Sequence, residues 1–368
     1  MVPERYMRRR WEKFWEAVEE KGLALDSLLI INDFHVGDKC FFYMSGFDEG
    51  LFESASFYMD GKDATVIVPK LEEDIASSFY GDVVSYRDYN KRWDEIKKII
   101  RGDKAIGVLF SKITHETYMK LRKIAYRAKL VDVSAVLSKM RMVKDEIEIS
   151  RIKEACKIAS KVYPKVLETA KEGVPEYRIA AEIVYIMQKN GAQESAFTPI
   201  VAYGENSALP HYTNGERKLR RGDVILMDYG AVRLRYNSDM TRTAIYGINN
   251  DIEDIYNVVL EAQECAINAI RAGVKSTDVD AAAREIIDKS KYKGRFIHST
   301  GHGLGLDVHD GGSLSPYTEI VLEENMVFTV EPGVYVPGVG GVRIEDVVVV
   351  KRGGGEVLTT SPKELLQL

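Results

Sequence analysis

In the first third of the chain, some hydrophobic residues are spaced as in helices and others lie in short runs typical of strands. Apolar residues recur at helical spacing over residues 4–21, 93–100 and 115–125. Strand-like apolar runs lie at residues 27–31, 40–44, 55–59, 64–68 and 105–109. This alternation of helical and strand patterns predicts a small α/β domain that ends near residues 130–136.

The remainder of the chain carries two similar helix-rich segments, each followed by strand-like runs. From Asp145 onward apolar residues return at helical spacing, and Pro164 is expected to end or kink that helix. A second helical pattern covers residues 252–272. The two segments end in Gly173-Val174 and Gly273-Val274, which indicates a faint internal repeat.

Two predicted hairpins each carry a pair of acidic residues. Asp228 and Asp239 lie in strand-like runs on either side of a short turn around Arg233 and Leu234. Glu331 and Glu345 lie symmetrically about the turn at Pro337-Gly338. In a regular antiparallel hairpin such residues are directly opposed, with Cβ atoms roughly 4.5 to 5.5 Å apart. The pattern therefore predicts two matched acid pairs.

The strands around these acids are rich in valine and read as buried. Four carboxylates crowded in an apolar sheet would repel one another and hold protons unless cations compensate their charge. Two divalent ions supply four positive charges, and His302 in Gly301-His302-Gly303-Leu304-Gly305 adds a nitrogen ligand. Each acid taken alone is more often a cap or half of an ion pair. The joint pattern favours a two-metal site, and its oxygen-rich ligand set suits manganese, cobalt or iron better than zinc.

The composition of the chain excludes several classes of function. The chain has 368 residues, 45% of them hydrophobic, which is enough for two ordinary cores. A formal net charge of −5 gives no electrostatic case for nucleic acid. We find no secretory signal, no run of transmembrane length, and none of the paired spacings of a cysteine metal or redox motif. These features predict a cytoplasmic protein without a membrane or nucleic-acid partner.

The motif blocks around the predicted ligands resemble those of the pita-bread metallopeptidases, the family of methionine aminopeptidase, aminopeptidase P, prolidase and creatinase. The blocks are Gly222-Asp223 with Asp228-x-Gly230, Ser238-Asp239-x-Thr241-Arg242-Thr243, Thr300-Gly301-His302-Gly303-x-Gly305, Glu331-Pro332-Gly333 and Arg343-Ile344-Glu345-Asp346. The resemblance is close from Ser138 to the end and looser before it. It implies a creatinase-like α/β domain over residues 1–137 and an α+β pita-bread catalytic domain over residues 138–368, with a pseudo-twofold internal repeat.

The resemblance also implies a metal set and a reaction. The ligand positions are filled by Asp228, Asp239, His302, Glu331 and Glu345. Two divalent ions per subunit, manganese or cobalt with zinc and iron as alternatives, would hold a bridging hydroxide that attacks the carbonyl before proline. Glu331 would also accept and pass on the proton. His211 and His309 match family positions that contact substrate, whereas His298, His35 and His115 are interpreted as structural.

Three further residues are expected to support the site. Arg343 lies two residues before Glu345 on the same strand face, so it either pairs with the ligand carboxylates or contacts substrate. Thr241 and Thr243 share the face that carries Asp239. Their predicted role is hydrogen bonding to a ligand carboxylate, and the alternative is simple strand propensity.

Within this family the chain resembles the branch that cleaves before proline, because methionine aminopeptidases normally lack such an N-terminal domain. An Xaa-Pro dipeptidase, or prolidase, is favoured by the compact N-terminal domain and the block at residues 207–211. The alternative is an Xaa-Pro aminopeptidase acting on longer peptides, because Gly311-Gly312-Ser313 stands where many microbial prolidases carry Pro-Arg. A non-catalytic scaffold of the same fold would predict a missing ligand. The resemblance further implies a homodimer.

Overall fold

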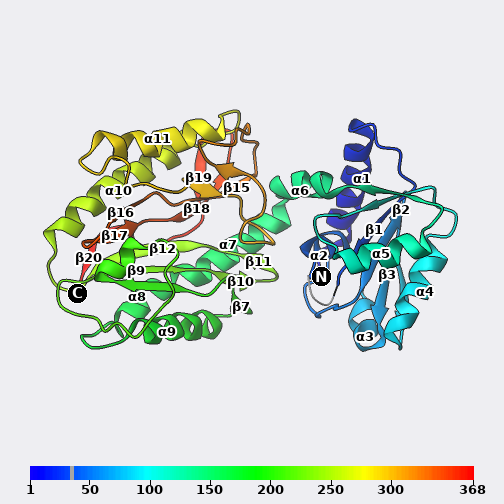
Figure 1. Cartoon of the computed structure of the whole chain (residues 1–368), viewed down its shortest axis with the longest axis horizontal. Coiled ribbons are helices and arrows are strands. Elements are labelled where there is room, and N and C mark those ends of the chain that lie inside the picture. Colours follow the sequence, from blue (N-terminus) through cyan, green and yellow to red (C-terminus); the bar gives the residue numbers. More distant parts are fainter. Residues whose placement is uncertain (34–36) are drawn as a thin grey trace. The chain divides into compact units, whose positions relative to one another are not determined.

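A computed structural model describes residues 1–33 and 37–368, so His35 lies outside the described residues. The chain divides into two compact units, Met1–Arg141 and Met142–Leu368 (Figure 1). Helix α6 (Ser134–Met142) spans both the end of the first unit and the domain boundary predicted between residues 137 and 138. In the described ranges no helix is long and apolar enough to cross a membrane.

The first unit is an α/β domain, as predicted. Its six-stranded mixed sheet has the order β4-β3-β2-β1-β5-β6, in which β2 pairs antiparallel with β1 and β3. The strands are β1 (Ser27–Ile31), β2 (Ser56–Asp60), β3 (Asp63–Pro69), β4 (Asp82–Tyr86), β5 (Ala105–Val108) and β6 (Lys129–Asp132). The helices besides α6 are α1 (Glu4–Glu20), α2 (Lys39–Ser45), η1 (Lys70–Glu72), α3 (Glu73–Ala76), α4 (Tyr89–Ile99) and α5 (His115–Ile124).

One predicted strand of this unit was wrong. Residues 40–44 form most of helix α2, although their aromatic side chains favour strands. The Asp38 side chain accepts a hydrogen bond from the Cys40 N–H and caps the start of the helix, and Gly46 ends it at a φ of 76°. These end signals, together with burial of the aromatic side chains, override the strand propensity.

The second unit places helices on both sides of its strands. Figure 1 shows α10 (Asn250–Ala269) and α11 (Ser276–Lys289) on one side, and α8 (Val162–Leu167) and α9 (Glu176–Lys189) on the other. A four-stranded sheet has the order β20-β12-β9-β8, and a three-stranded sheet has the order β15-β18-β19. The strands of these two sheets are β8 (Ile200–Tyr203), β9 (Val224–Tyr229), β12 (Met240–Ile245), β15 (Val327–Val330), β18 (Asp346–Val350), β19 (Gly355–Val357) and β20 (Leu366–Gln367).

The second unit also contains shorter strands and one 3-10 helix. They are β7 (Glu194–Ser195), η2 (Gly204–Ala208), β10 (Ala231–Arg233), β11 (Tyr236–Asn237), β13 (Gly301–His302), β14 (Ser313–Leu314), β16 (Gly333–Val336) and β17 (Gly340–Arg343). One apolar core packs α8 and α9 against β8 and β9, and another packs α10 and α11 against β15 to β18. Each half of the unit therefore has its own core.

The entry helix of this unit begins and ends where the sequence predicts. Helix α7 (Glu146–Ser160) starts with a capping box, in which Asp145 and Glu148 each accept a hydrogen bond from the other's backbone N–H. It ends before Lys161, and Pro164 lies in the first turn of α8. Proline has no N–H and its ring would clash with the carbonyl of Ser160, so the helix breaks ahead of it.

The predicted internal repeat is confirmed by matching backbone contacts. Gly173 and Gly273 have φ angles of 83° and 89°. Their N–H groups donate to the carbonyls of Leu219 and Leu322 over 2.9 and 2.8 Å. A helix of 14 residues follows each glycine after two further residues, α9 in the first half and α11 in the second. The two halves therefore share one local architecture, as the pseudo-twofold prediction requires.

Candidate metal centre

The first acid hairpin has a different register from the one predicted. Its turn is formed by Leu234 and Arg235, whose φ angles of 47° and 70° match a two-residue turn with left-handed backbone. Asp228 consequently pairs with Thr241 across β9 and β12. The prediction that Asp228 and Asp239 lie directly opposite each other was therefore wrong. Asp239 lies two residues before Thr241, so the two acids are diagonal neighbours on one face.

The second acid hairpin has the predicted register. Val330 pairs with Asp346 on one side of the acids, and Gly333 pairs with Arg343 on the other. Continuing either ladder places Glu331 opposite Glu345. The ladder opens at these positions because the Glu331 N–H donates to the Thr300 carbonyl over 2.7 Å and the Glu345 N–H to the Thr241 carbonyl over 3.1 Å. The bond from Glu345 to Thr241 links the second half of the unit to the first half beside the acids.

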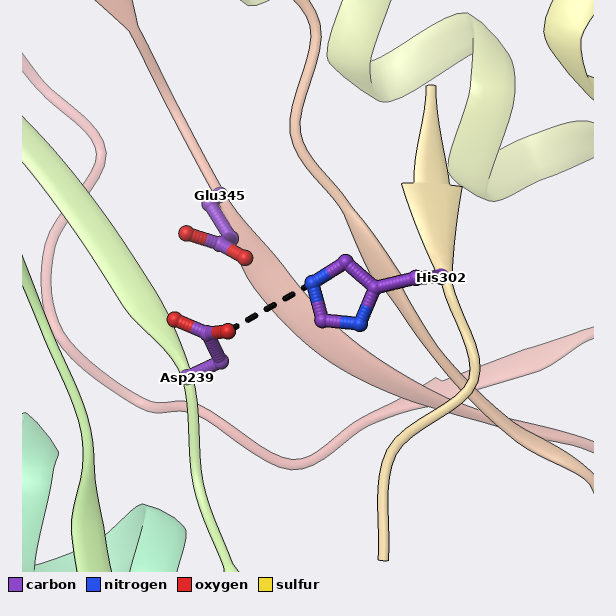
Figure 2. Close-up of side chains that lie close together, drawn as sticks. All are labelled: Asp239, His302 and Glu345. Carbon is purple, nitrogen blue, oxygen red and sulfur yellow. Dashed lines mark ion pairs between the residues drawn. The ribbon is translucent and has the colours of Figure 1, made fainter. Parts of the chain in front are cut away.

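His302 completes the cluster from β13. Its backbone N–H donates to the Thr329 hydroxyl over 3.0 Å, and its Nδ1 lies 3.2 Å from the Gly303 carbonyl oxygen. This leaves Nε2 facing carboxylate oxygens of Asp239 at 3.6 Å and Glu331 at 3.5 Å. Figure 2 shows Asp239, His302 and Glu345 turned toward one another from three separate segments of the chain. One ligand atom from each of these three lies within 4.8 Å of the others, which is the spacing of a metal site.

Burial makes this cluster electrostatically costly without cations. It raises the pKa of Glu331 to about 8, with repulsion from Asp228 adding to the effect. Burial, followed by repulsion between the acids, also holds the pKa of Asp239 and Glu345 well above the ordinary range. The pKa of His302 is lowered to about 4, chiefly by burial, so its ring is neutral and able to ligate.

Two buried carboxylate oxygens identify where cations fit. In the described part of the chain, the Oδ1 atoms of Asp228 and Asp239 have no hydrogen-bond partner. Buried polar atoms rarely remain unpaired. Four carboxylates and one neutral imidazole form a donor set suited to divalent ions, and the unpaired oxygens give such ions open ligand positions. The residues present therefore fit the metal centre that the sequence predicts.

Arg343 connects the acids to the surrounding strands. Its guanidinium is buried, lies 2.5 Å from Asp228 Oδ2, and donates to the hydroxyls of Thr241 and Tyr335 over 3.1 and 2.9 Å. Thr241 in turn donates to Glu345 Oε2 over 2.7 Å. Thr243 is different, because its hydroxyl donates to the backbone carbonyl of Arg343 rather than to a carboxylate. One guanidinium facing four carboxylates still leaves an excess of negative charge for metal ions to neutralise.

A cavity of about 530 Å³ opens over the acids. His211 and His309 both line it, together with Arg343 and the five predicted ligands. The rings of His309 and His302 meet edge to face with centroids 4.1 Å apart. Phe197, Ile200, Pro210 and Val308 add apolar lining. The cavity thus combines apolar side chains with a cluster of carboxylates, histidines and one arginine, as small-molecule sites commonly do.

The sequence analysis missed two residues of this site. His298, interpreted as structural, lines the cavity, and its Nε2 lies 2.8 Å from the Tyr335 hydroxyl. Tyr335 also accepts a hydrogen bond from Arg343, so His298, Tyr335 and Arg343 are linked by hydrogen bonds that end at Asp228. His298 lies only four residues before the predicted ligand His302, and this proximity could have indicated that it belongs to the site. Nothing in the local sequence marks Tyr335, which lies in the same hairpin as Arg343 but 37 residues from His298.

Comparisons with known proteins agree with this geometry. Residues 150–352 match the family described as metallopeptidase family M24, and residues 10–143 match the creatinase/prolidase N-terminal domain. The chain is 37% identical over 364 residues to the Xaa-Pro dipeptidase of Pyrococcus furiosus, which covers 98% of this chain and 100% of that protein.

Solved structures are similar over the same extent. An Xaa-Pro dipeptidase from Bacillus anthracis matches with a TM-score of 0.91 and 35% identity, covering 98% of this chain and 100% of that one. An X-Pro aminopeptidase from Thermotoga maritima matches with a TM-score of 0.89 and 34% identity, covering 95% of this chain and 99% of that one. The similarity therefore extends to both units of the chain.

Proposed function

Because the chain belongs to metallopeptidase family M24, we propose that it is an Xaa-Pro dipeptidase that hydrolyses the bond before proline with divalent metal ions. The observation that carries this proposal is the buried cluster of four carboxylates and one imidazole, with unpaired oxygens on Asp228 and Asp239. A structural ion-pair network would match its carboxylates with cations. In the described part of the cluster Arg343 instead pairs with Asp228, and metal ions would neutralise the remaining acids.

Asp228, Asp239, His302, Glu331 and Glu345 would hold two ions, manganese or cobalt by the oxygen-rich donor set. When bound, such ions acidify a water molecule and polarise the carbonyl of the scissile bond. The protein supplies the orientation. Thr241 holds the Glu345 carboxylate, and Thr329 donates to the Glu331 carboxylate over 3.2 Å. Metal ligands oriented in this way retain their geometry as substrate enters.

The side chains around the ions have separable roles. Glu331 accepts a proton from the attacking water and delivers it to the departing imino nitrogen of proline. His211 and His309, on the cavity wall, stabilise negative charge that develops on the carbonyl oxygen and orient the proline ring. Arg343 holds Asp228 in place. Proline substrates need such a dedicated site because their amide nitrogen lacks an N–H and their ring is rigid.

The dipeptide is the favoured substrate. The Pyrococcus furiosus relative, which matches over almost the whole chain, is an Xaa-Pro dipeptidase, and a cavity of about 530 Å³ is within the range for a small ligand. The alternative, an aminopeptidase acting on longer peptides, is supported by the Thermotoga maritima structure. It is also supported by Ser313, which lines the cavity at the position where many microbial prolidases have arginine.

Two further parts of the proposal concern the protein as a whole. A homodimer and a cytoplasmic location are predictions from the sequence. Size-exclusion chromatography with light scattering tests the first, since a species of only 41.5 kDa would exclude the dimer. Fractionation of the source cells tests the second.

A metal titration tests the proposed chemistry. Protein stripped with a chelator should release no proline from an Xaa-Pro dipeptide, and the rate should rise with added manganese or cobalt until about two equivalents per chain are bound. No proline release at any metal loading would refute the proposed function.

A further inference from the structure

The carboxylate of Glu176 takes part in none of the chemistry described above, yet it is fully buried and completely hydrogen-bonded. Its Oε1 accepts from the Tyr203 N–H over 2.9 Å and the Asn206 side chain over 3.0 Å. Its Oε2 accepts from the Tyr212 hydroxyl over 2.8 Å and the Gly215 N–H over 3.0 Å. Glu176 is the first residue of α9, where the helix N-terminus favours a negative charge.

The four donors bracket His211. They belong to residues 203–215, which we call the His211 segment. The His211 side chain is exposed and has no hydrogen-bond partner in the described part of the chain, so its position depends on the backbone that carries it. The adjacent Tyr212 hydroxyl is held by Glu176 and also accepts from the Asn206 amide over 2.8 Å. Both ends of the His211 segment are therefore tied to one carboxylate.

The same segment contacts a strand that reaches the metal centre. The Gly341 N–H donates to the Ser207 hydroxyl over 2.7 Å. The approach is so close that a Cβ added at Gly341 would lie 2.2 Å from the Ser207 carbonyl oxygen. Gly341 lies in β17, which ends at Arg343. Fixing the His211 segment to Glu176 on one side and to β17 on the other holds His211 beside the acids.

The internal repeat shows that the fold alone does not require a carboxylate at this position. Ser276, the first residue of α11, is the counterpart of Glu176, and the backbone N–H groups of both donate across to the following segment. The Ser276 hydroxyl makes two bonds, to the Thr318 carbonyl and from the Ile320 N–H. A small hydroxyl is sufficient there, whereas the first half uses an acceptor-only group for four donors.

We propose that Glu176 is a positioning residue that holds His211 over the metal centre, an inference that rests on the proposed function. Its carboxylate has enough lone pairs for all four donors. A glutamine would offer one acceptor oxygen and turn an NH2 group toward donors such as the Gly215 N–H. The geometry of the His211 segment therefore depends on the charge of Glu176, and His211 depends on that segment.

A double-mutant cycle tests this role in the metal-loaded full-length protein. Glu176→Gln is made in the wild type and in His211→Ala, and kcat/KM is measured on an Xaa-Pro dipeptide. In the wild type, Glu176→Gln should lower kcat/KM about tenfold or more, because several charge-assisted hydrogen bonds are lost. In His211→Ala the same change should lower it less than about threefold, because its effect passes through His211. Metal content should be unchanged in all variants.

Equal losses in both backgrounds, or no loss in the wild type, would overturn the proposal. If Glu176→Gln fails to fold, Tyr212→Phe removes a single bond to the same carboxylate and should show the same dependence on His211 with a smaller loss. Ser276→Ala is the matched control and should leave kcat/KM unchanged in both backgrounds. Failure of the proposed function is distinct, since metal-loaded wild type would then not cleave the dipeptide at all.

Discussion

Removing the metal ions should make the stability of the protein fall as pH rises from about 4.5 to about 8. Burial raises the pKa of Glu331 from 4.5 to about 8, so the folded metal-free protein binds a proton that the unfolded chain has already released. Stability decreases with pH wherever the folded state binds more protons. The stabilisation is fully present below the unfolded pKa and is lost as pH rises through the folded pKa. Asp239 and Glu345 shift in the same direction.

The size of the effect follows from Glu331. Its side chain is only 18% exposed, so solvent screens the shift weakly. A rise in pKa from 4.5 to about 8 corresponds to roughly 5 kcal/mol of unfolding free energy. In a domain of this size, 1 kcal/mol moves the Tm by about 2–4 °C. Between pH 5 and pH 8 these two pKa values give a loss of roughly 3.5 kcal/mol, so the Tm of the metal-free protein should fall by roughly 7–14 °C over that range.

Calorimetry of the chelator-treated protein across this pH range measures the effect, with Glu331→Gln as the matched control. The glutamine is neutral at every pH, so a substantial part of the slope should disappear in that variant. Adding metal should reverse the trend in the wild type, because metal ions compete with protons for the carboxylates. A metal-free wild type whose Tm stays constant or rises with pH would refute the reasoning.

The other predictions concern single side chains. Asp239→Asn and Glu345→Gln should each lose bound metal and lower kcat by more than about 100-fold; full activity with metal analysis showing normal content would contradict the ligand assignment. His309→Ala should keep its metal, as measured by elemental analysis, while kcat falls about 100-fold. Loss of metal in that variant would mean that His309 is a ligand. Arg343→Met strips the buried cation from Asp228 and should cost about 3–5 kcal/mol in urea unfolding at fixed metal concentration. An unchanged midpoint and slope would show that the pair contributes little.

The two acid hairpins show what sequence can and cannot predict. The second hairpin turns through Pro337-Gly338, a common turn pair, and its register was predicted correctly. The first turns through Leu234 and Arg235, both with positive φ angles, where side chains other than Gly, Asn and Asp are uncommon. No local signal places the turn there, so the register was predicted wrongly. The acids still share a face, because the alternation of side chains along a strand survived the error.

Some residues of the candidate site could likewise be predicted from the sequence, and others could not. The ligand residues could be proposed from motif spacing, because buried carboxylates in valine-rich strands are conspicuous in the sequence. The hydrogen bonds that link His298 through Tyr335 to Arg343 could not, since the contact of His298 with Tyr335 joins segments 37 residues apart and no motif marks Tyr335. Thr241 and Thr243 occupy the same strand face, yet one bonds a carboxylate and the other a backbone carbonyl. Only the neighbouring strand decides which.

Hydrolysis by the metal-loaded protein tests the central claim most directly. An Xaa-Pro dipeptide, an Xaa-Pro-Yaa tripeptide and a dipeptide without proline are compared at equal concentration, and kcat/KM is measured for each. The account predicts cleavage of the Xaa-Pro dipeptide, with the tripeptide a poorer substrate and the proline-free peptide untouched. A preference for the tripeptide would make the protein an aminopeptidase, and inactivity toward all three with both metal ions bound would contradict the account.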